Sequence, residues 1–381
     1  MENLFSHLVS VGVRADDSII TKILGHQNPH YQKRGGLGFG IHGIVTSSNP
    51  LFPFPRGINS RINPTSSLEL RKTNEDQKYE IYSGKEKVAS MQLFKAASWI
   101  NEKLKNGKFV AEILQQHTAR NLVGVLGNPK CPLFISNSPC SFCDMQGGKE
   151  NIKRTRQEIL ESLEIILSYK KDYILTFTTP LFQSLEFHEI CSTIEDIKKK
   201  FSIPVALECQ PLQSSQVEMI RQTGLDTIMI PMDCYSSESR SLHIPGKKLL
   251  LERYYWQTTP KLVKIFGAGN VISNLIVGLE NIEFTRQAID KMIDFEIIPD
   301  LLPLRPTKRT PNLETNPEYM NWLQEYLTSR LKTSGLQQKA SRVKAGCAAC
   351  GGCSAGFTPN MILDKKIRPY IPPDPGRCDN H

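Results

Sequence analysis

The sequence has no long apolar run and no signal for export. Its first residues, MENLFSHLVSVGVRADD, contain no basic segment followed by an apolar one. No stretch approaches the roughly 20 apolar residues of a membrane-spanning helix. We therefore expect a cytoplasmic protein without membrane association. In a reducing cytosol thiols are available to bind metal, so the 10 cysteines argue against a disulfide framework.

The sequence also lacks the marks of a nucleic-acid-binding protein. The net charge is +9, but the basic residues are scattered over segments such as DIKKKFS, and no recognised nucleic-acid motif accompanies them. Nucleic acid is therefore not an expected partner, although the charge leaves an acidic or phosphorylated partner open. With 381 residues and 39% hydrophobic residues, the chain is long enough for one barrel-sized domain with an appendage.

Residues 1–118 form the expected N-terminal extension. Residues 1–65 are rich in Gly, Pro, Asn and Ser, which predicts loops that serve as an arm or a lid. Apolar residues recur at helical spacing over 91–118, and we predict a helix there, interrupted near Asn106, that caps one end of a barrel.

Strand-like and helix-like patterns alternate over residues 119–311. The expected strands are 121–127, 172–180, 204–210, 226–233, 270–279 and 296–306. The expected helices between them are 156–171, 185–200, 215–224, 249–267 and 283–295. This alternation requires parallel strands with crossover helices, so the sequence predicts an α/β fold, a complete or partial TIM-barrel-like barrel. Residues 312–381 add a helix over 317–335 and a Cys-rich extension outside the barrel pattern.

Three cysteines follow the first expected strand directly. Cys131, Cys140 and Cys143 are separated by eight and then two residues, and loops after barrel strands build active sites. A CxxC pair with a third thiolate holds three irons of a 4Fe-4S cluster and leaves the fourth iron open. The alternatives are buried thiols without metal and a zinc site, which needs four protein ligands; His188 and Cys191 are the nearest extra candidates.

This motif resembles that of the radical S-adenosylmethionine superfamily, in particular its biotin synthase and lipoyl synthase branch. The superfamily motif is CxxxCxxC with an aromatic residue before the last cysteine, and Phe142 occupies that place, which lies near the adenine in the family. The first gap is longer here. The resemblance implies a 4Fe-4S cluster on Cys131, Cys140 and Cys143 that binds S-adenosylmethionine. It also implies reductive cleavage to a 5′-deoxyadenosyl radical, which abstracts hydrogen from a substrate.

Later segments carry the same resemblance. RQTGLDTIMIPMD, which ends at Asp233, implies that this carboxylate approaches the ribose, and VISNLIVGLE implies adenine contact at Gly278 with Glu280 closing the motif. LLPLRPTKRTP, over 301–311, resembles the branch's penultimate strand. Thr178 and Thr179 stand where the superfamily often has a Gly-Gly-Glu stretch that meets the methionyl amino group.

Two charged residues at strand ends add candidate contacts. Glu208 lies at the carboxyl end of the expected strand, in the segment VALEC. We expect its carboxylate to face the barrel mouth there and to bond a ribose hydroxyl or the substrate. A salt-bridged glutamate is the alternative. Arg305 lies between prolines near another strand end, where a guanidinium binds a substrate or cofactor carboxylate in a bidentate manner. A surface arginine is the alternative there.

A second set of cysteines lies near the C-terminus. Cys347, Cys350 and Cys353 form a CxxCxxC run, and Cys378 follows some way downstream. Such gaps favour an auxiliary 4Fe-4S cluster completed by the remote cysteine, as in the bacterial ferredoxin run. Structural zinc on four thiolates is the rival, because all-cysteine zinc sites use similar spacings. The remaining cysteines are expected to pack in the core: Cys191, Cys209 and Cys234.

The second set decides which reaction the resemblance implies. If it supplies sulfide, the reaction is sulfur insertion of the biotin or lipoyl synthase type, on a small-molecule or acyl-carrier-bound substrate. The alternatives are a radical enzyme of cofactor biosynthesis without sulfur transfer and a non-catalytic iron-sulfur or zinc binding protein. A radical enzyme also needs a reducing electron donor, such as ferredoxin or flavodoxin. The position of the second set after the barrel fits a two-component enzyme with a partner subunit.

Overall fold

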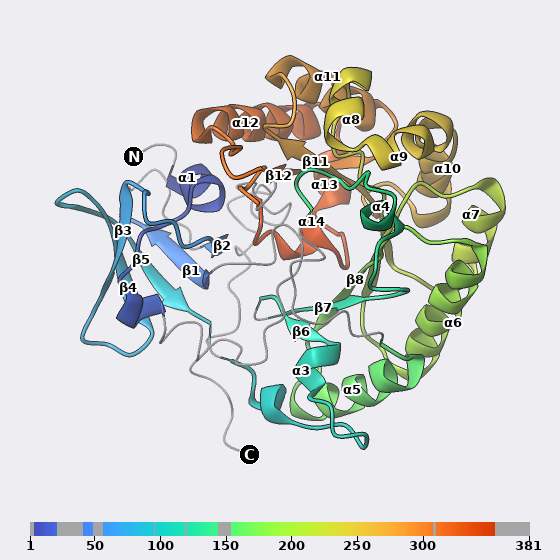
Figure 1. Ribbon diagram of the computed structural model, residues 1–381, viewed down its shortest axis with the longest axis horizontal. Coiled ribbons are helices and arrows are strands. Elements are labelled where there is room, and N and C mark those ends of the chain that lie inside the picture. Colours follow the sequence, from blue (N-terminus) through green and yellow to red (C-terminus); the bar gives the residue numbers. More distant parts are fainter. Residues whose placement is uncertain are drawn as a thin grey trace.

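The computed structural model describes residues 4–20, 41–48, 56–94, 96–118, 120–143, 154–307 and 310–354. They form a seven-stranded sheet and a five-stranded sheet. Figure 1 shows the larger sheet enclosed by an arc of helices, with the smaller sheet beside it. One continuous hydrophobic cluster includes residues from both sheets, so the two parts share a core.

The seven-stranded sheet contains all six strands expected between residues 121 and 306. Its strands are β6 (Gln115–Gln116), β7 (Asn121–Val125), β8 (Ile174–Thr178), β9 (Val205–Glu208), β10 (Thr227–Met229), β11 (Val271–Val277) and β12 (Ile298–Pro303). They lie in the order β12-β11-β10-β9-β8-β7-β6. Neighbours from β7 to β12 pair in parallel, and only the short β6 pairs antiparallel.

The central strands are apolar runs because both of their faces are covered. Every residue of β11, VISNLIV, and of β12, IPDLLP, is buried. A parallel sheet requires such continuous apolar runs when crossover helices cover one of its faces and other segments of the same chain cover the opposite face. Each fully buried Val, Ile or Leu side chain contributes roughly 1.5–3 kcal/mol of transfer free energy. The polar residues within these strands therefore stand out.

Helices that connect the strands cover the outer face of the sheet (Figure 1). They are α5 (Arg156–Tyr169), α6 (Ser184–Lys200), α7 (Ser214–Arg221), α10 (Trp256–Phe266) and α11 (Ile282–Asp294). Thr155 and Glu158 form the capping box that starts α5, and α6 ends in three lysines that complement the helix dipole. In the described part of the chain the edge strands β6 and β12 do not pair with each other. The fold is therefore α/β, with a partial TIM-barrel-like sheet.

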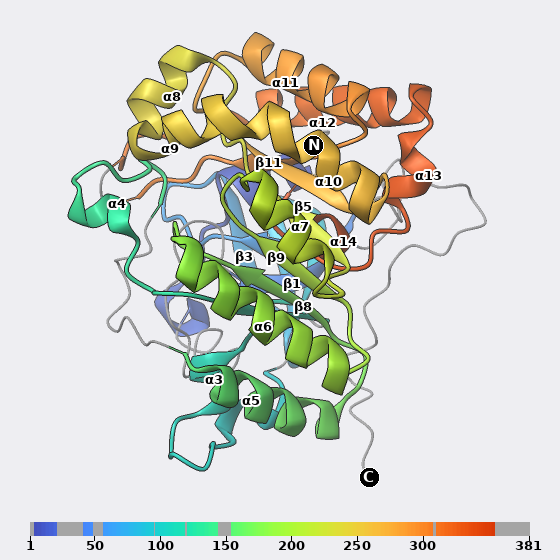
Figure 2. The same ribbon diagram turned by 90° about the vertical axis from the view of Figure 1, so that its right-hand side faces the viewer.

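The helix expected over 249–267 is confirmed, and it runs from Pro245 to Phe266 with a π-helical turn inside it. It comprises α9 (Pro245–Leu250), a π-helical turn (Leu251–Tyr255) and α10. Pro260 lies inside α10 and has no N–H to offer the carbonyl group one turn earlier. The first turn of α10 therefore lacks one backbone hydrogen bond, and the π-helical turn directly precedes it. α9 lies beside α8 (Ser237–His243) and continues through the π-helical turn into α10, as Figure 2 shows.

The loops expected over residues 1–65 are a partly wrong prediction. The five-stranded antiparallel sheet has the order β2-β1-β5-β4-β3, and its first two strands fall in that range. Its strands are β1 (Ile41–Ser47), β2 (Arg56–Ser60), β3 (Leu68–Lys72), β4 (Lys78–Ser83) and β5 (Glu86–Leu93). In β1 buried residues alternate with more exposed ones, which is the period-2 pattern of a sheet with one covered face. The glycines and prolines around it obscured that pattern.

The helix expected over 91–118 is also wrong. Residues 91–93 end β5, and only two short helices follow, η2 (Ser98–Asn101) and α3 (Val110–Ile113). Gly107 has φ of +84°, and the Leu104 amide donates to the Lys108 carbonyl at 2.8 Å, so a tight turn divides the segment. The apolar residues at helical spacing belong to separate short elements, such as Trp99, which is buried.

The N-terminal and C-terminal parts of the chain both pack onto the barrel. Helix α1 (Leu4–Ser10) contacts β2 and α12 (Pro317–Thr333). After α13 (Leu336–Ala340), the Cys-rich segment forms α14 (Cys347–Cys350). This segment lies outside the strand-helix alternation of the sequence, but Figure 1 shows it inside the arc of helices. It lies close to the sheet, since a Cβ on Gly346 would be 2.8 Å from the Met229 side chain of β10. The second set of cysteines therefore packs against the inner face of the sheet.

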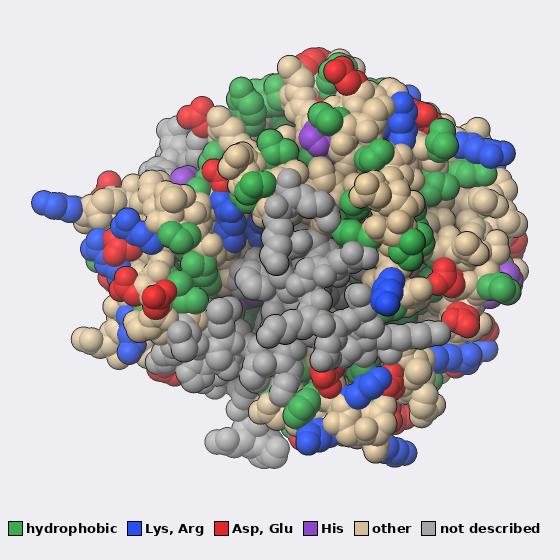
Figure 3. Space-filling view, in the orientation of Figure 1, with side chains coloured by type: hydrophobic (Ala, Val, Ile, Leu, Met, Phe, Trp, Pro, Cys, Tyr) green, Lys and Arg blue, Asp and Glu red, His purple; other side chains and the backbone are tan. Residues whose placement is uncertain are grey.

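The described surface mixes charges of both signs. On the face shown in Figure 3, Lys and Arg side chains are interspersed with Asp and Glu side chains. Among the described residues, no helix combines the length and the apolar character needed to cross a bilayer.

Candidate functional site: two sets of cysteines in the barrel

The first set of cysteines lies in the loop after β7. Cys131 precedes the short helix α4 (Pro132–Ile135), and Cys140 and Cys143 follow it. The loop is held against α8 and α9, where Figure 2 shows α4. The Ser141 amide donates to the His243 carbonyl at 2.8 Å, and a Cβ on Gly246 would come within 2.3 Å of Leu133. Only glycine at position 246 therefore permits this packing.

The three thiols of the first set influence one another. Cys131 and Cys140 are each 8% exposed, and Cys143 is half-buried. Burial raises the pKa of Cys140 to about 12; nearby Lys247 opposes this rise, whereas Asp233 and the other two thiols add to it. The structure thus brings the predicted trio together at the carboxyl edge of the sheet.

A buried ion pair lies beside Cys140. The Lys247 ammonium group donates a hydrogen bond to a carboxylate oxygen of Asp233, whose side chain is only 4% exposed. Asp233 has φ of +63°, a region that non-glycine residues rarely adopt. Its amide donates to the Asn274 carbonyl at 3.0 Å, and its carbonyl accepts from the Ile276 amide at 2.8 Å. β11 therefore fixes the backbone of Asp233, and its charge is compensated by Lys247.

A layer of buried polar side chains lies within the sheet. The Asn274 amide group donates to the Glu208 carboxylate at 2.9 Å, and Asn274 lies opposite Asp300 in the β11–β12 register. Burial, reinforced by the charge of Glu208 and opposed by a hydrogen bond from Ser354, raises the pKa of Asp300 to about 7. The Oδ1 atom of Asn274 and the Oδ2 atom of Asp300 are buried without a hydrogen-bond partner in the described structure. These two oxygens are acceptors available to a bound donor.

Glu208 connects the two sets of cysteines electrostatically. Burial opposes the rise in the pKa of Lys247; Asp233 and Cys140 cause most of that rise, and the charge of Glu208 adds to it. It also contributes to the raised pKa of Cys347 in the second set, after burial and Asp300. Glu208 therefore influences groups beside both sets of cysteines.

The second set contacts the chain that enters β7. The Cys353 thiol is 3.1 Å from Nε2 of His117, and the Cys350 thiol is 3.8 Å from Oγ1 of Thr118. Asn59 of β2 donates its side-chain amide to the Cys353 sulfur at 3.6 Å, and its backbone amide donates to the Gly352 carbonyl at 2.7 Å. Burial raises the pKa of Cys353 to about 12. Cys378, the expected fourth ligand, lies outside the described residues.

The other predicted cofactor contacts occupy the same edge, and their roles stay predictions. Thr178 lies opposite Glu208 in the β8–β9 register, and the Thr179 amide donates to the Glu208 carbonyl at 3.0 Å. Phe142 packs partly buried against the core. Gly278, with φ of +105°, packs under Thr315, where a Cβ would be 3.1 Å from the threonine Oγ1 atom.

Two predicted contacts make internal hydrogen bonds in the described structure. The Glu280 carboxylate accepts from the amides of Tyr235 and Ser236, and burial raises its pKa despite those bonds. Arg305, expected as a carboxylate ligand or a surface side chain, is buried at 8% exposure. It donates to the carbonyls of Val9 at 2.9 Å and of Asn59 at 2.8 Å, so it joins the N-terminal part to the barrel.

The donor chemistry of both sets fits a metal that prefers thiolates. Each set offers three cysteines, and bound iron or zinc favours the deprotonated thiolates that burial disfavours here. Among the residues that the structure describes, no three His, Cys, Asp or Glu side chains are drawn together closely enough to hold a metal ion. Metal binding at either set therefore requires some of these side chains to change position.

Sequence reasoning missed four residues of this site. Asn274 and Asp300 had a visible signal, because each is a lone polar residue within a strand of buried apolar residues. Lys247 and His117 had no such signal, since neither belongs to a motif. Only the packing of α9 beside the loop of the first set, and of residues 117–118 beside α14, identifies them.

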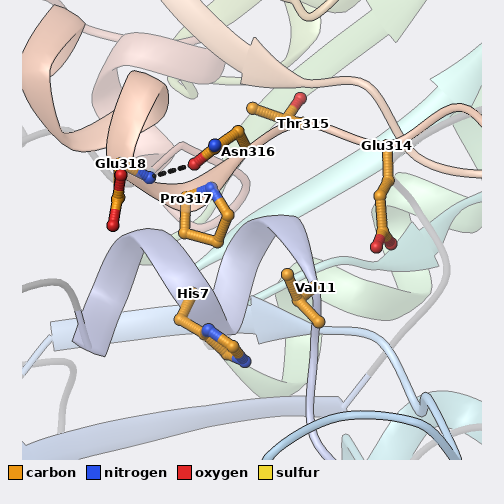
Figure 4. Close-up of a pocket in the computed structure, with 7 residues that line it drawn as sticks. All are labelled: His7, Val11, Glu314, Thr315, Asn316, Pro317 and Glu318. Atoms are coloured by element: carbon orange, nitrogen blue, oxygen red, sulfur yellow. Dashed lines mark hydrogen bonds between the residues drawn. The ribbon is translucent and has the colours of Figure 1, made fainter.

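A pocket of about 620 Å³ lies elsewhere, between α1 and the start of α12. It is lined by His7, Val11, Glu314, Thr315, Asn316, Pro317 and Glu318 (Figure 4). Burial lowers the pKa of His7, and the Asn316 side chain accepts from the Glu318 amide at 2.7 Å. The lining contains no cysteine and no residue of the polar layer, so this pocket is separate from the candidate site.

Comparisons with known proteins give remote structural likenesses only. No protein-family model matches the sequence, and no curated protein matches it. The FeFe-hydrogenase maturase HydG from Carboxydothermus hydrogenoformans matches with a TM-score of 0.41 and 13% identity, over 62% of this chain and 59% of that chain. The radical S-adenosylmethionine methyltransferase TsrM from Kitasatospora setae matches with a TM-score of 0.38 and 15% identity, over 51% of this chain and 38% of that chain.

Methylornithine synthase PylB matches with a TM-score of 0.42 and 12% identity, over 61% of this chain and 72% of that chain. This chain thus spans less than two thirds of the length of HydG and TsrM. Likenesses of this size assign no activity to the chain.

Proposed function

We propose that the protein is a radical S-adenosylmethionine enzyme whose 4Fe-4S cluster is held by Cys131, Cys140 and Cys143. The observation that carries the proposal is the position of this trio. The three thiols lie together in one loop at the carboxyl edge of a parallel sheet, where barrel enzymes build their active sites. A trio leaves one iron without a protein ligand, which suits a cofactor that chelates iron.

The bound cluster and S-adenosylmethionine would supply the chemistry, namely reductive cleavage to a 5′-deoxyadenosyl radical that abstracts hydrogen from the substrate. The role of the chain is to bind and orient. Asp233 and Lys247 place a compensated pair of charges beside Cys140, from which they bind the polar groups of the cofactor. Holding the reacting carbons in one geometry is the main contribution that a protein makes to such a reaction.

The polar layer supports binding of a ligand with hydrogen-bond donors. Asn274 Oδ1 and Asp300 Oδ2 are buried acceptors without partners among the described residues. Ribose hydroxyls and amino groups are donors of the kind that satisfy them. We assign Glu208, which is fixed by Asn274, to orient the same ligand.

The reaction that follows hydrogen abstraction depends on the second set. Sulfur insertion of the biotin or lipoyl synthase type requires a second iron-sulfur cluster that loses sulfide during turnover. A radical enzyme of cofactor biosynthesis without sulfur transfer keeps its second centre intact, whether iron-sulfur or zinc. The enclosure of Cys353 by His117 and Asn59 favours the intact centre, because a sulfide donor needs access to the substrate.

Anaerobic reconstitution with iron and sulfide, followed by reduction in the presence of S-adenosylmethionine, tests the proposal. The expected product is 5′-deoxyadenosine, at a level that Cys140→Ala reduces to background. Cys234→Ala is the matched control, because Cys234 is a buried cysteine outside both sets. Wild-type protein that carries the cluster and yields no 5′-deoxyadenosine would overturn the enzyme assignment, and undiminished product from Cys140→Ala would overturn the site.

A further inference from the structure

His117 lies where a fourth ligand of the second set would lie. Its Nε2 atom is 3.1 Å from the Cys353 sulfur. Two ligands of one tetrahedral metal with ordinary metal-nitrogen and metal-sulfur bond lengths are about 3.6 Å apart. The imidazole and the thiol therefore need to separate by only about half an ångström to share an ion. No movement of the backbone is needed for this pair.

The chain around His117 already encloses the other thiols of the set. Thr118 contacts the Cys350 sulfur, and its methyl group would be 3.3 Å from a Cβ on Gly352. Cys347 and Cys350 bound the one-turn helix α14, and the Gly351 amide donates to the Cys347 carbonyl at 2.7 Å. One short segment before β7 thus lies against a run of three thiols from the other end of the chain.

Asp300 is the other candidate ligand beside the second set. Asp300 is 7% exposed, and its Oδ2 atom has no hydrogen-bond partner among the described residues. Its carboxylate accepts a hydrogen bond from Ser354, the residue after Cys353. Asp300 is thus a competing ligand to His117, but His117 is the one in direct contact with a thiol of the set.

We propose that His117 is the fourth protein ligand of a metal centre held by Cys347, Cys350 and Cys353. The centre takes three thiolates and one imidazole, a donor set used by structural zinc and available to iron. Cys378 is then not required, and neither is a ligand from another chain. A centre closed by four protein ligands has no open coordination position.

This inference rests on the second metal centre of the proposed function and not on cleavage of S-adenosylmethionine. The experiment therefore uses a full-length variant with Cys131, Cys140 and Cys143 all changed to Ala, so that only the second set binds metal. Iron, zinc and acid-labile sulfide are measured in protein isolated anaerobically. X-ray absorption at the metal edge then counts nitrogen and sulfur neighbours.

The expected result in this background is one metal centre per chain with one nitrogen neighbour. Iron together with sulfide would identify the centre as a cluster, and zinc without sulfide would identify it as a single ion. His117→Ala is expected to weaken retention of the metal against a chelator by more than about tenfold. His117→Cys is expected to restore retention while the nitrogen neighbour disappears. If the histidine had only a structural role, its substitution would change the retention of metal, but the nitrogen and sulfur neighbours of the metal would stay the same.

Cys378→Ala and Asp300→Asn are the matched controls, and both are expected to keep the metal and the nitrogen neighbour. Retention unchanged in His117→Ala overturns the inference, as does loss of the metal in Cys378→Ala or Asp300→Asn alone. A spectrum of His117→Cys identical to that of the background protein also overturns it. If wild-type protein fails to cleave S-adenosylmethionine while the second centre behaves as expected, only the proposed function fails.

Discussion

The two sets of cysteines differ in how they are assembled. Cys131, Cys140 and Cys143 belong to one loop, and the groups beside them are charged, namely Asp233 and Lys247. The second set is enclosed by separate parts of the chain: Asn59 of β2, and His117 and Thr118 of the segment before β7, touch its sulfur atoms.

This contrast is what different tasks require. A site that exchanges a charged cofactor needs charged groups at an accessible edge, and the cost of burying them is offset by pairing. A permanent centre needs enclosure and hydrogen bonds to its thiolates from several parts of the chain. We therefore expect substitutions at the first set to change activity, and substitutions around the second set to change metal retention and stability.

The largest expected effect comes from removing one thiol of the first set. Cys140→Ala is expected to lower formation of 5′-deoxyadenosine by more than about 100-fold, since even partners that only support a metal ligand are worth 10- to 100-fold. Metal content at the second set is expected to stay unchanged. Rate measurements by chromatography and elemental analysis check both parts; equal losses of metal at both sets would abolish the distinction between them.

The next largest effect comes from the ion pair beside Cys140. Lys247→Met leaves the buried Asp233 carboxylate without compensation and is expected to lower the free energy of unfolding by about 3–5 kcal/mol. Asp233→Asn together with Lys247→Met is expected to recover most of that loss. Urea unfolding followed by circular dichroism measures both.

Lys248→Met is the control for this experiment, because Lys248 adjoins Lys247 but is more exposed. It is expected to change stability by no more than about 0.5 kcal/mol. A loss in the double variant as large as in Lys247→Met would mean that the lysine stabilises the fold by packing and not by its charge.

A smaller effect is expected at the junction next to the second set. Arg305→Met removes two hydrogen bonds to the carbonyls of Val9 and Asn59, and leaving buried acceptors unsatisfied costs about 2–3 kcal/mol. Because the Asn59 backbone also binds Gly352, metal at the second set is expected to be lost faster to a chelator. Arg221→Met, at an exposed ion pair, serves as the control. If Arg305→Met loses metal at the same rate as the wild type, the hydrogen bonds of Arg305 do not support the second set.

The smallest effect is expected at Glu280. Glu280→Gln keeps one acceptor oxygen for the amides of Tyr235 and Ser236 and is expected to cost about 1 kcal/mol. If Glu280 only holds the loop after β10, the KM for S-adenosylmethionine stays within about twofold, since the side chain then makes no contact with the ligand. A tenfold rise in KM without loss of stability would instead indicate direct contact with the cofactor.

The sequence predicts the barrel better than it predicts the site. The six strands from 121 to 306 are confirmed because buried parallel strands are continuous apolar runs separated by amphipathic helices. The cysteine trio was visible as a motif in one loop. The sheet of residues 41–93 was not, because the glycines and prolines of residues 34–64 favoured loops over the period-2 pattern of β1. Lys247 and His117 meet the cysteines only through tertiary packing, which no local pattern encodes.

The contact between His117 and Cys353 joins residues 236 positions apart in the chain. A chain emerging from the ribosome completes the loop of Cys131, Cys140 and Cys143 long before Cys353 is synthesised. Since earlier parts of a chain begin to fold first, the first set would be in place while the inner face of the sheet still lacks α14. In the proposed metal centre, closure of the second set would then be a late step of maturation, and metal bound there would mark molecules whose two ends have met.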